Sequence, residues 1–220
     1  TMRLTDYDSF SQEFQLTGDT DNLSYVTGVY YFTDDGFTDN PQTFFGGATR
    51  FDSKAGFDTE SYAIYGQLDW EATDKLTLTG GLRYTSEEKT IDRSLVLLGE
   101  TDIPLVPVGT KSSASFDNVS PTVIASYAAT DDINVYGKYS EGYKSGGFNG
   151  EANTIEEVTR PYSAEKVRSY EAGVKSELYD GKATLNAAVF YNEHKDMQLS
   201  VFTAEDASGS DVRNAGEATM

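Results

Sequence analysis

The amino-acid sequence predicts an all-β fold, an antiparallel up-and-down transmembrane β-barrel, and three observations carry this prediction. Strand-like segments alternate between an uncharged face and a polar face. Very short turns alternate with very long connections, and aromatic residues mark the ends of the apolar faces. In a barrel that crosses a membrane, the apolar side of each strand faces lipid and the polar side faces a water-filled lumen.

The segment 60–71 shows the alternation most clearly. Because successive side chains of a strand point to opposite faces, its residues divide into two sets. The uncharged set is Tyr62, Ile64, Gly66, Leu68 and Trp70. The segment 75–86 repeats the pattern, whereas the segment 22–33 is less regular because apolar residues occupy both of its faces.

We expect about nine strands. In chain order they are 10–17, 22–33, 61–71, 75–86, 117–128, 133–144, 168–178, 183–201 and a truncated 212–220. Short turns rich in Asp and Gly, which favour tight hairpins, fall at 18–21, 73–74, 129–132 and 180–181. Long loops are expected at 34–60, 87–116, 145–167 and 202–211, all at the opposite end. This arrangement is an up-and-down meander.

Composition narrows the function classes. The chain has 220 residues and no apolar run of eighteen, which excludes a transmembrane helix, whereas barrel strands need apolar residues only at alternate positions. The net charge of −19 argues against nucleic acid as a partner. There is no cysteine and a single histidine, His194, so no zinc site or Ser-His-Asp triad is expected. We therefore expect no enzyme, no metal site and no cofactor.

Aromatic residues are predicted to form a girdle at each membrane interface. From Tyr62 to Trp70 is eight residues, or roughly 27 Å of strand, which spans roughly 20 Å of bilayer when tilted by about 40°. The long-loop girdle is Tyr62, Tyr84, Tyr139, Tyr170 and Tyr191, and the short-turn girdle is Trp70 and Tyr127.

Several strings of residues also resemble a known family. They are SQEFQLT (11–17), YVTGVYYF (25–32), SYAIYGQLDWEATDKLTLTGGLRYTSEEK (61–89), VYGKYSEGYKSGGFN (135–149), SYEAGVKSELYDGKATLNAAVFYNEHKDMQ (169–198) and NAGEA (214–218). In this combination and order they are similar to the barrel of TonB-dependent outer-membrane receptors.

The resemblance implies a fragment of a 22-stranded barrel in the outer membrane of a Gram-negative cell. Such receptors import scarce ligands, often ferric siderophores, with energy from the TonB complex acting through an N-terminal plug. Residues 1–220 are then expected to be a partial barrel domain, truncated at both ends and without the plug. Its partners would be outer-membrane lipid, a small-molecule ligand such as a ferric siderophore, and TonB through the missing plug.

The glycine-rich segment 141–150 supplies the candidate ligand contacts. It lacks the strand–loop–helix context of a phosphate loop, so it is interpreted as a strand end that opens into an adaptable loop. In that loop Tyr143, Lys144 and Phe148 are expected to touch ligand.

Charged residues on the polar strand faces are expected to face the lumen, where they are solvated, paired across strands or in contact with a plug. These residues are Asp69, Arg83, Lys138, Glu171 and Lys175.

Two other function classes remain open from the sequence. A passive porin or structural outer-membrane barrel would need a closed strand count and, for a porin, a charged constricting loop. A soluble β-propeller or sandwich acting as a binding module would show shorter loops and charges on both strand faces.

Overall fold

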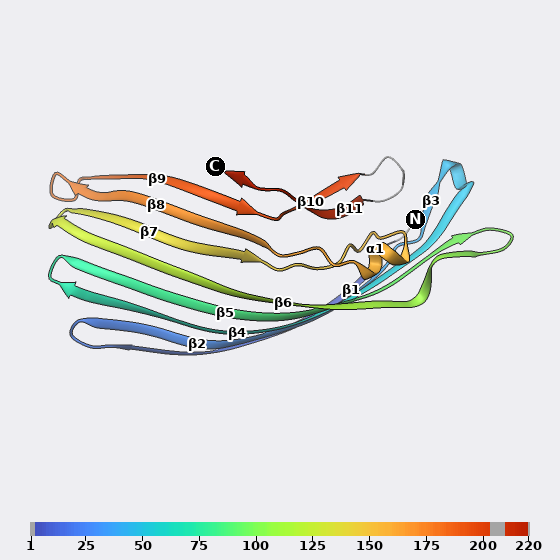
Figure 1. Cartoon of the computed structure of the whole chain (residues 1–220), viewed down its shortest axis with the longest axis horizontal. Coiled ribbons are helices and arrows are strands. Elements are labelled where there is room, and N and C mark those ends of the chain that lie inside the picture. The colour runs from blue at the N-terminus through green and yellow to red at the C-terminus, as the bar shows by residue number, and fades with distance from the viewer. Residues whose placement is uncertain (1–2, 203–209, 220) are drawn as a thin grey trace.

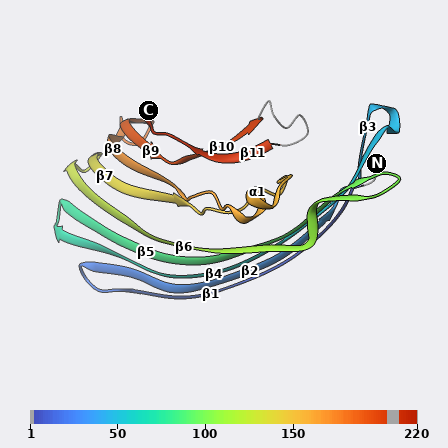
Figure 2. The ribbon, with the colours of Figure 1, turned by 45° about the vertical axis from the view of Figure 1, so that its right-hand side comes forward.

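In the computed structural model, which describes residues 3–202 and 210–219, the chain forms one curved antiparallel sheet (Figures 1 and 2). The sheet follows the order β1-β2-β4-β5-β6-β7-β8-β9-β12, so consecutive strands are neighbours, and β3 pairs with β4. Strands β10 and β11 form a separate two-stranded sheet. The two outer strands, β1 and β12, do not pair with each other within the described residues, so this part of the chain is an open segment of a meander.

The elements have the following bounds. The strands are β1 (Leu4–Asp19), β2 (Leu23–Asp39), β3 (Gln42–Phe44), β4 (Thr49–Thr73), β5 (Leu76–Leu98), β6 (Ile103–Thr130), β7 (Ile133–Lys144), β8 (Glu165–Leu178), β9 (Ala183–Lys195), β10 (Met197–Phe202), β11 (Ser210–Ala215) and β12 (Ala218–Thr219). The helices are a 3-10 turn at Phe45–Gly47 and α1 (Ile155–Thr159). Among the described residues, no helix is long and apolar enough to cross a membrane.

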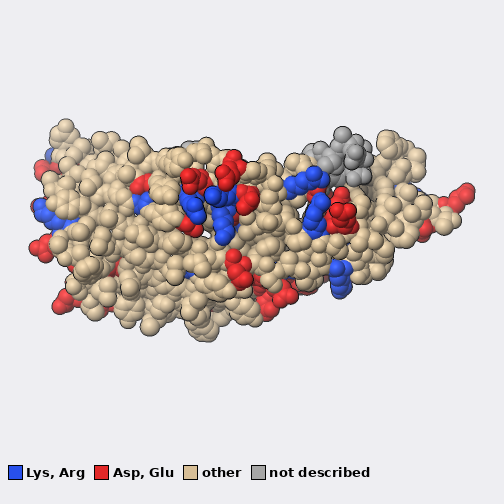
Figure 3. Space-filling model, viewed as in Figure 1, with Lys and Arg blue, Asp and Glu red and all other residues tan. Residues whose placement is uncertain are grey.

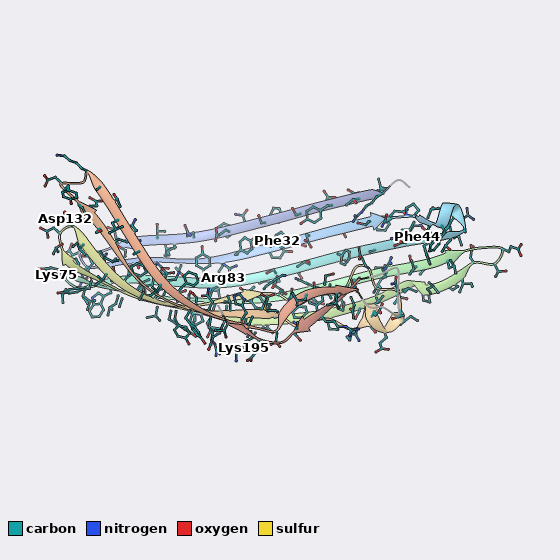
Figure 4. The ribbon with its side chains drawn as sticks, turned by 90° about the horizontal axis from the view of Figure 1, so that it is seen from above. Phe32, Phe44, Lys75, Arg83, Asp132 and Lys195 are labelled. Atoms are coloured by element: carbon teal, nitrogen blue, oxygen red, sulfur yellow. The ribbon has the colours of Figure 1, made fainter. Side chains whose placement is uncertain are left out.

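The predicted short turns are confirmed, and local chemistry explains them. At the β4–β5 turn the Thr73 hydroxyl accepts hydrogen bonds from the backbone N–H groups of Lys75 (3.2 Å) and Leu76 (3.0 Å). At the β8–β9 turn Tyr179, Asp180 and Gly181 all have positive φ, a conformation that Gly adopts at no steric cost. Figure 4 shows two of the turns, labelled at Lys75 and Asp132, at the end of the sheet opposite Phe44.

Two of the predicted long loops are wrong: residues 34–60 and 87–116 are mostly strand. Strands β4, β5 and β6 run for 25, 23 and 28 residues, and β4 pairs with β5 from Arg50–Leu98 down to Thr73–Leu76. From Tyr62 toward the long hairpins, the strict alternation of apolar and polar residues ends, and acidic residues such as Asp58 and Glu60 appear. For this reason the sequence pattern did not predict strands there. Their backbone hydrogen bonds nevertheless continue beyond the apolar band as long hairpins.

The C-terminal strands are also divided differently from the prediction. The expected strand 183–201 breaks at Asp196, whose φ is 54°, into β9 and β10, and β10 leaves the main sheet. The expected strand 212–220 is two strands, β11 and β12. Residues 203–209 of the expected loop 202–211 lie outside the described residues.

Strand register assigns every side chain to a face, because residues directly opposite in an antiparallel pair share one. This settles the irregular strand β2. Tyr25 lies opposite Leu68 and Tyr31 lies opposite Tyr62, so both belong to the apolar face. Tyr30, opposite Ala63, belongs to the polar face.

The apolar face is the more exposed face of the sheet. Ile64, Leu68 and Leu82 are 56%, 53% and 54% exposed, whereas Ala63, on the polar face of β4, is buried. Figure 3 shows a broad stretch with few charged residues between the short-turn end and a belt of charges nearer the middle. A continuous exposed apolar face of this kind marks a surface that contacts a membrane or another protein.

The hydrophobic core lies at the long-hairpin end and on the polar-face side. Its buried residues are Ile91, Leu95, Val106, Phe148, Ala152 and Val158. They join β5 and β6 to the segment 145–164, which carries α1 and lies within the curve of the sheet (Figure 2). The segment expected to be an adaptable loop is therefore packed.

The face assignment yields a first prediction. In the full-length parent protein, Leu82→Arg, opposite Gly66 midway between Tyr62 and Trp70, would place a cation on the apolar face near the bilayer midplane and should cost about 2–4 kcal/mol. The neighbouring Gln67→Arg, on the polar face, should cost much less. The free energy of unfolding of both variants is measured by urea titration in liposomes, with the folded fraction read from heat-modifiable gel mobility. Equal destabilisation by the two would contradict the assignment of faces.

Candidate functional site

The polar face carries all five charged residues that were expected to face a lumen. Asp69, Lys138 and Glu171 lie in one row across the sheet, linked by the pairs Asp69–Thr79, Thr79–Ile124, Ile124–Lys138 and Lys138–Glu171. Arg83, opposite Tyr65, and Lys175, opposite Asn134, lie on the same face.

Arg83, Lys175 and Glu171 are held by aromatic rings and hydroxyl groups. The Arg83 guanidinium lies 5.6 Å from the ring centres of both Tyr30 and Tyr65, which is cation–π geometry. The Tyr65 hydroxyl donates to Glu13 (2.7 Å). Lys175 lies 5.6 Å from the ring centre of Tyr136, whose hydroxyl donates to Glu171. This fixes the positions of the cations on the polar face.

A hollow of about 510 Å³ opens on this face toward the long-hairpin end. Its lining combines three cations, four aromatic rings, one carboxylate and several polar groups. The residues are Arg83, Lys89, Lys144, Tyr30, Phe32, Tyr143, Tyr162, Glu87, Ser61, Thr85, Ser145 and Gln198. Such a mixture suits a ligand that is anionic and partly aromatic.

Tyr143 and Lys144 reach the hollow because β7 ends there. β7 pairs with β6 only up to Ser140 and continues beside β8 as far as Lys144. The hydroxyls of Tyr143 and Ser145 are buried and have no hydrogen-bond partner within the described residues. The Tyr143 hydroxyl lies beside the Ser145 hydroxyl and the Glu87 carboxylate, so the three groups form one polar part of the lining.

Phe148 does not line this hollow, and its contact with ligand stays a prediction. Its side chain is 8% exposed and belongs to the core cluster with Ile91 and Val106. Burial of an aromatic ring of this size anchors the segment 145–164 to the long hairpins. Phe148 therefore supports the segment 145–164 beside the hollow without lining the hollow.

Sequence reasoning missed Arg93, which fixes the same segment from β5. This guanidinium is 3% exposed and donates to the carbonyls of Ala152 (3.1 Å), Lys54 (3.0 Å) and Ser94 (2.9 Å) and to the Ser53 hydroxyl (2.9 Å). Burial lowers its pKa. The alternation Ile91-Arg93-Leu95 is typical of side chains on one face of a strand. It was not used because residues 87–116 were predicted to be a loop.

The short helix α1 is defined by a capping box. The Thr154 hydroxyl accepts from the backbone N–H of Glu157 (3.2 Å), and the Glu157 carboxylate accepts from the backbone N–H groups of Thr154 (3.3 Å) and Asn153 (2.7 Å). This cap orients Val158 into the core.

Two amides from the last hairpin hold the ends of the segment 145–164. The Gln198 side chain donates to the carbonyls of Ser145 (2.8 Å) and Ser163 (3.1 Å). The Asn214 side chain donates to the Ser163 carbonyl (2.9 Å) and accepts from the Ser163 N–H (2.7 Å). Asn214 belongs to the string NAGEA, so this string has a structural role.

The residues expected to form girdles all lie on the apolar face. Tyr139, Tyr170 and Tyr191 occupy one row of β7, β8 and β9, with ring centres 5.1 and 6.2 Å apart. On the other strands the hydroxyls of Tyr62 and Tyr84 donate to acidic neighbours nearer the long hairpins. Trp70 and Tyr127 are exposed near the short turns.

An antiparallel meander with an exposed apolar face, a polar opposite face and a ligand-sized hollow at one end defines a β-barrel membrane receptor or transporter. A family model described as "TonB dependent receptor-like, beta-barrel" matches residues 1–220. The chain belongs to this family, whose members are Gram-negative outer-membrane proteins. This confirms the resemblance found in the sequence.

Curated relatives are receptors. The chain is 35% identical over 148 residues to the pesticin receptor of Yersinia pestis, which covers 67% of this chain and 21% of that protein. It is 26% identical over 158 residues to the rhizobactin receptor of Rhizobium meliloti (strain 1021), covering 61% of this chain and 20% of that protein. The chain thus spans about a fifth of the length of these relatives.

Solved structures agree with the fold. The ferric yersiniabactin uptake receptor FyuA from Yersinia pestis superposes with a TM-score of 0.80 at 26% identity, over 99% of this chain and 32% of that one. The copper transporter OprC superposes with a TM-score of 0.71 at 15% identity, over 99% of this chain and 35% of that one, which is a likeness of fold. These relatives are receptors and transporters, not enzymes.

The role of Arg93 yields a second prediction. In the full-length protein, Arg93→Met should expose the segment 145–164 to hydrogen exchange about tenfold faster or more, since each buried acceptor left unpaired costs about 1–3 kcal/mol. The exposed Arg50→Met, also on the long hairpins, is the matched control. Unchanged protection of the segment in Arg93→Met would show that the apolar cluster alone holds it.

Proposed function

We propose that this chain forms part of the barrel of an outer-membrane receptor that imports a ferric siderophore with energy supplied through TonB. The observation that carries the proposal is the hollow on the polar face, where Arg83, Lys89 and Lys144 converge with four aromatic rings. Ferric chelates with anionic donors and aromatic groups present the complementary charge and surface.

The relatives support the same class of ligand. FyuA is a ferric yersiniabactin uptake receptor, and the rhizobactin receptor is a second relative with a named ligand. The hollow is locally cationic although the chain as a whole carries a net charge of −19. A local reversal of charge at one concave place is what selective capture of an anion requires.

The two faces of the sheet indicate what would surround the chain in the full-length receptor. The apolar face would contact outer-membrane lipid, and the polar row through Asp69 and Lys138 would face the lumen and the plug of the full-length receptor. TonB would act on that plug, so the energised step belongs to parts of the receptor other than these strands.

The two alternative classes, a soluble binding module and a passive porin, have less support. A soluble binding module would not expose Ile64, Leu68 and Leu82 by more than half on one continuous face. A passive porin needs an open passage, whereas the segment 145–164 is packed by a core and by Arg93 across the inner side of the long hairpins.

The cationic lining yields a third prediction. In a strain that depends on the full-length receptor for iron, Lys89→Ala combined with Lys144→Ala should raise the ferric siderophore concentration for half-maximal uptake of radioactive iron by about 100-fold or more. Each lost charge-assisted contact is worth about 1.5–3 kcal/mol. Lys75→Ala, at the short-turn end, is the control.

The assay also separates ligand classes. Ferric yersiniabactin and ferric rhizobactin are the probes, each with its metal-free form as competitor. Unchanged uptake in the double variant would remove the hollow from ligand recognition. A receptor whose expression and transport are indifferent to iron would overturn the siderophore assignment in favour of another nutrient.

A further inference from the structure

The single histidine of the sequence, His194, lies on the same face of the sheet as the ligand hollow. It belongs to β9 and lies directly opposite Val167 of β8, which in turn lies opposite Gly142 of β7. Strand alternation places this row on the polar face that carries Lys138 and Glu171, and four residues closer to the long-hairpin end. His194 is therefore near the last residues of β7, where the hollow begins.

The imidazole of His194 is partly buried beside a carboxylate. Its side chain is 19% exposed, and Nδ1 lies 3.8 Å from Oε1 of Glu165. The Nδ1 atom is buried and has no hydrogen-bond partner within the described residues. A separation of 3.8 Å is too long for a hydrogen bond, so the contact attracts only when the imidazole carries a positive charge.

Glu165 connects His194 to the segment 145–164. Its Oε2 accepts a hydrogen bond from the backbone N–H of Gln198 (3.1 Å). The side chain of Gln198 donates to the carbonyls of Ser145 (2.8 Å) and Ser163 (3.1 Å), which lie at the two ends of the segment. Because Gln198 and Ser145 both line the ligand hollow, this series of contacts leads from the imidazole to the lining.

Few charged groups face His194 from the neighbouring strands. Val167 of β8 and Ala218 of β12 lie directly opposite it and are apolar. β8 contributes Glu165 to this face, and Lys144 of β7 lies directly opposite Glu165. Glu165 is therefore the acidic group that a proton on His194 attracts.

The other charges of these strands alternate onto the opposite face or lie beyond the strand end. Those on the opposite face are Lys166, Arg168, Glu193 and Lys195. Glu217 pairs with Lys195 (3.8 Å), and Asp196 is exposed at the bend that follows β9. Strand alternation thus separates most of the local charge from the imidazole.

Protonation changes the strength of the contact between His194 and Glu165. An imidazole gains its second proton between about pH 8 and pH 5, whereas a carboxylate stays ionised over most of that range. Below this range the pair attracts, and because it is partly buried the attraction is less screened than at a fully exposed site. Acidification therefore holds the Glu165 carboxylate in the position in which it receives the N–H of Gln198.

We propose that His194 is a positioning residue of the ligand hollow, whose protonation holds Glu165 in place and, through Gln198, tightens the attachment of the segment 145–164. This deepens the proposed function, because it makes the proton a regulator of the same hollow. His194 acts through Glu165 and Gln198.

Hydrogen exchange of the full-length receptor tests the proposal in detergent and without ligand. The exchange of residues 145–164 is measured by mass spectrometry at pH values of about 5.5 and about 7.5, on either side of the ordinary imidazole titration. Each rate is divided by the intrinsic rate of the unstructured peptide at that pH. We expect protection of the segment to be about threefold higher at the lower pH, as one partly buried ion pair would give.

Two variants identify the groups responsible. His194→Gln cannot gain the proton, so its protection should be the same at both pH values and close to that of the unaltered receptor at the higher pH. Glu165→Gln keeps an acceptor for the Gln198 N–H but loses the charge, so it should also lose the pH dependence. Glu141→Gln removes the pair with Arg168 (3.2 Å) on the other face of the same strands and is the matched control, which should keep the pH dependence.

The outcomes separate this proposal from the proposed function. Protection that rises equally on acidification in the unaltered receptor and in His194→Gln, or that does not rise in the unaltered receptor, overturns it. Protection lowered by the same factor at both pH values in His194→Gln would show a purely structural role and would also overturn it. Since no ligand is present, a failed uptake assay would count against the siderophore assignment alone.

Discussion

The rest of the structure depends on the continuous antiparallel ladder from β1 to β9. Inside a bilayer no water is available to satisfy backbone N–H and C=O groups, so each strand must pair with its neighbours along its whole membrane-spanning length. The ladder fixes which residues lie opposite one another. It therefore collects Asp69, Lys138 and Glu171 on one face and stacks the rings of Tyr139, Tyr170 and Tyr191 on the other.

The same strands reverse their burial pattern beyond the tyrosine girdle. Within the apolar band, Ile64 and Leu82 point away from the curve of the sheet, where lipid would cover them. In the long hairpins, Ile91 and Val106 point inward and are covered by the segment 145–164. This change from an outward to an inward apolar face is what water requires of the part outside the membrane, and it builds a packed mouth over the polar face.

The two faces consequently carry opposite chemistry at the same end of the sheet. Inside the curve, cations are held over tyrosine rings, as Arg83 is over Tyr30 and Tyr65, beside the ligand hollow. On the outside, tyrosine hydroxyls are paired with carboxylates such as Glu60 and Asp117. A cationic hollow inside the curve and a row of carboxylates on the outside can coexist because the sheet separates them.

The alternation of Tyr62 to Trp70 and of Leu76 to Tyr84, with the Asp- and Gly-rich turns, determined by itself the all-β class, the meander and the two faces, whereas the family followed from the resemblance of longer strings such as 61–89. These are local properties, set by the period of the strand and by turn geometry. Tertiary structure decided the rest. The length of β4 to β6 above the girdle depends on cross-strand pairing between polar residues, which has no alternating signature. The burial of Phe148 and Arg93 depends on the segment 145–164 folding back onto residues about 60 positions away, and sequence spacing cannot encode such a contact.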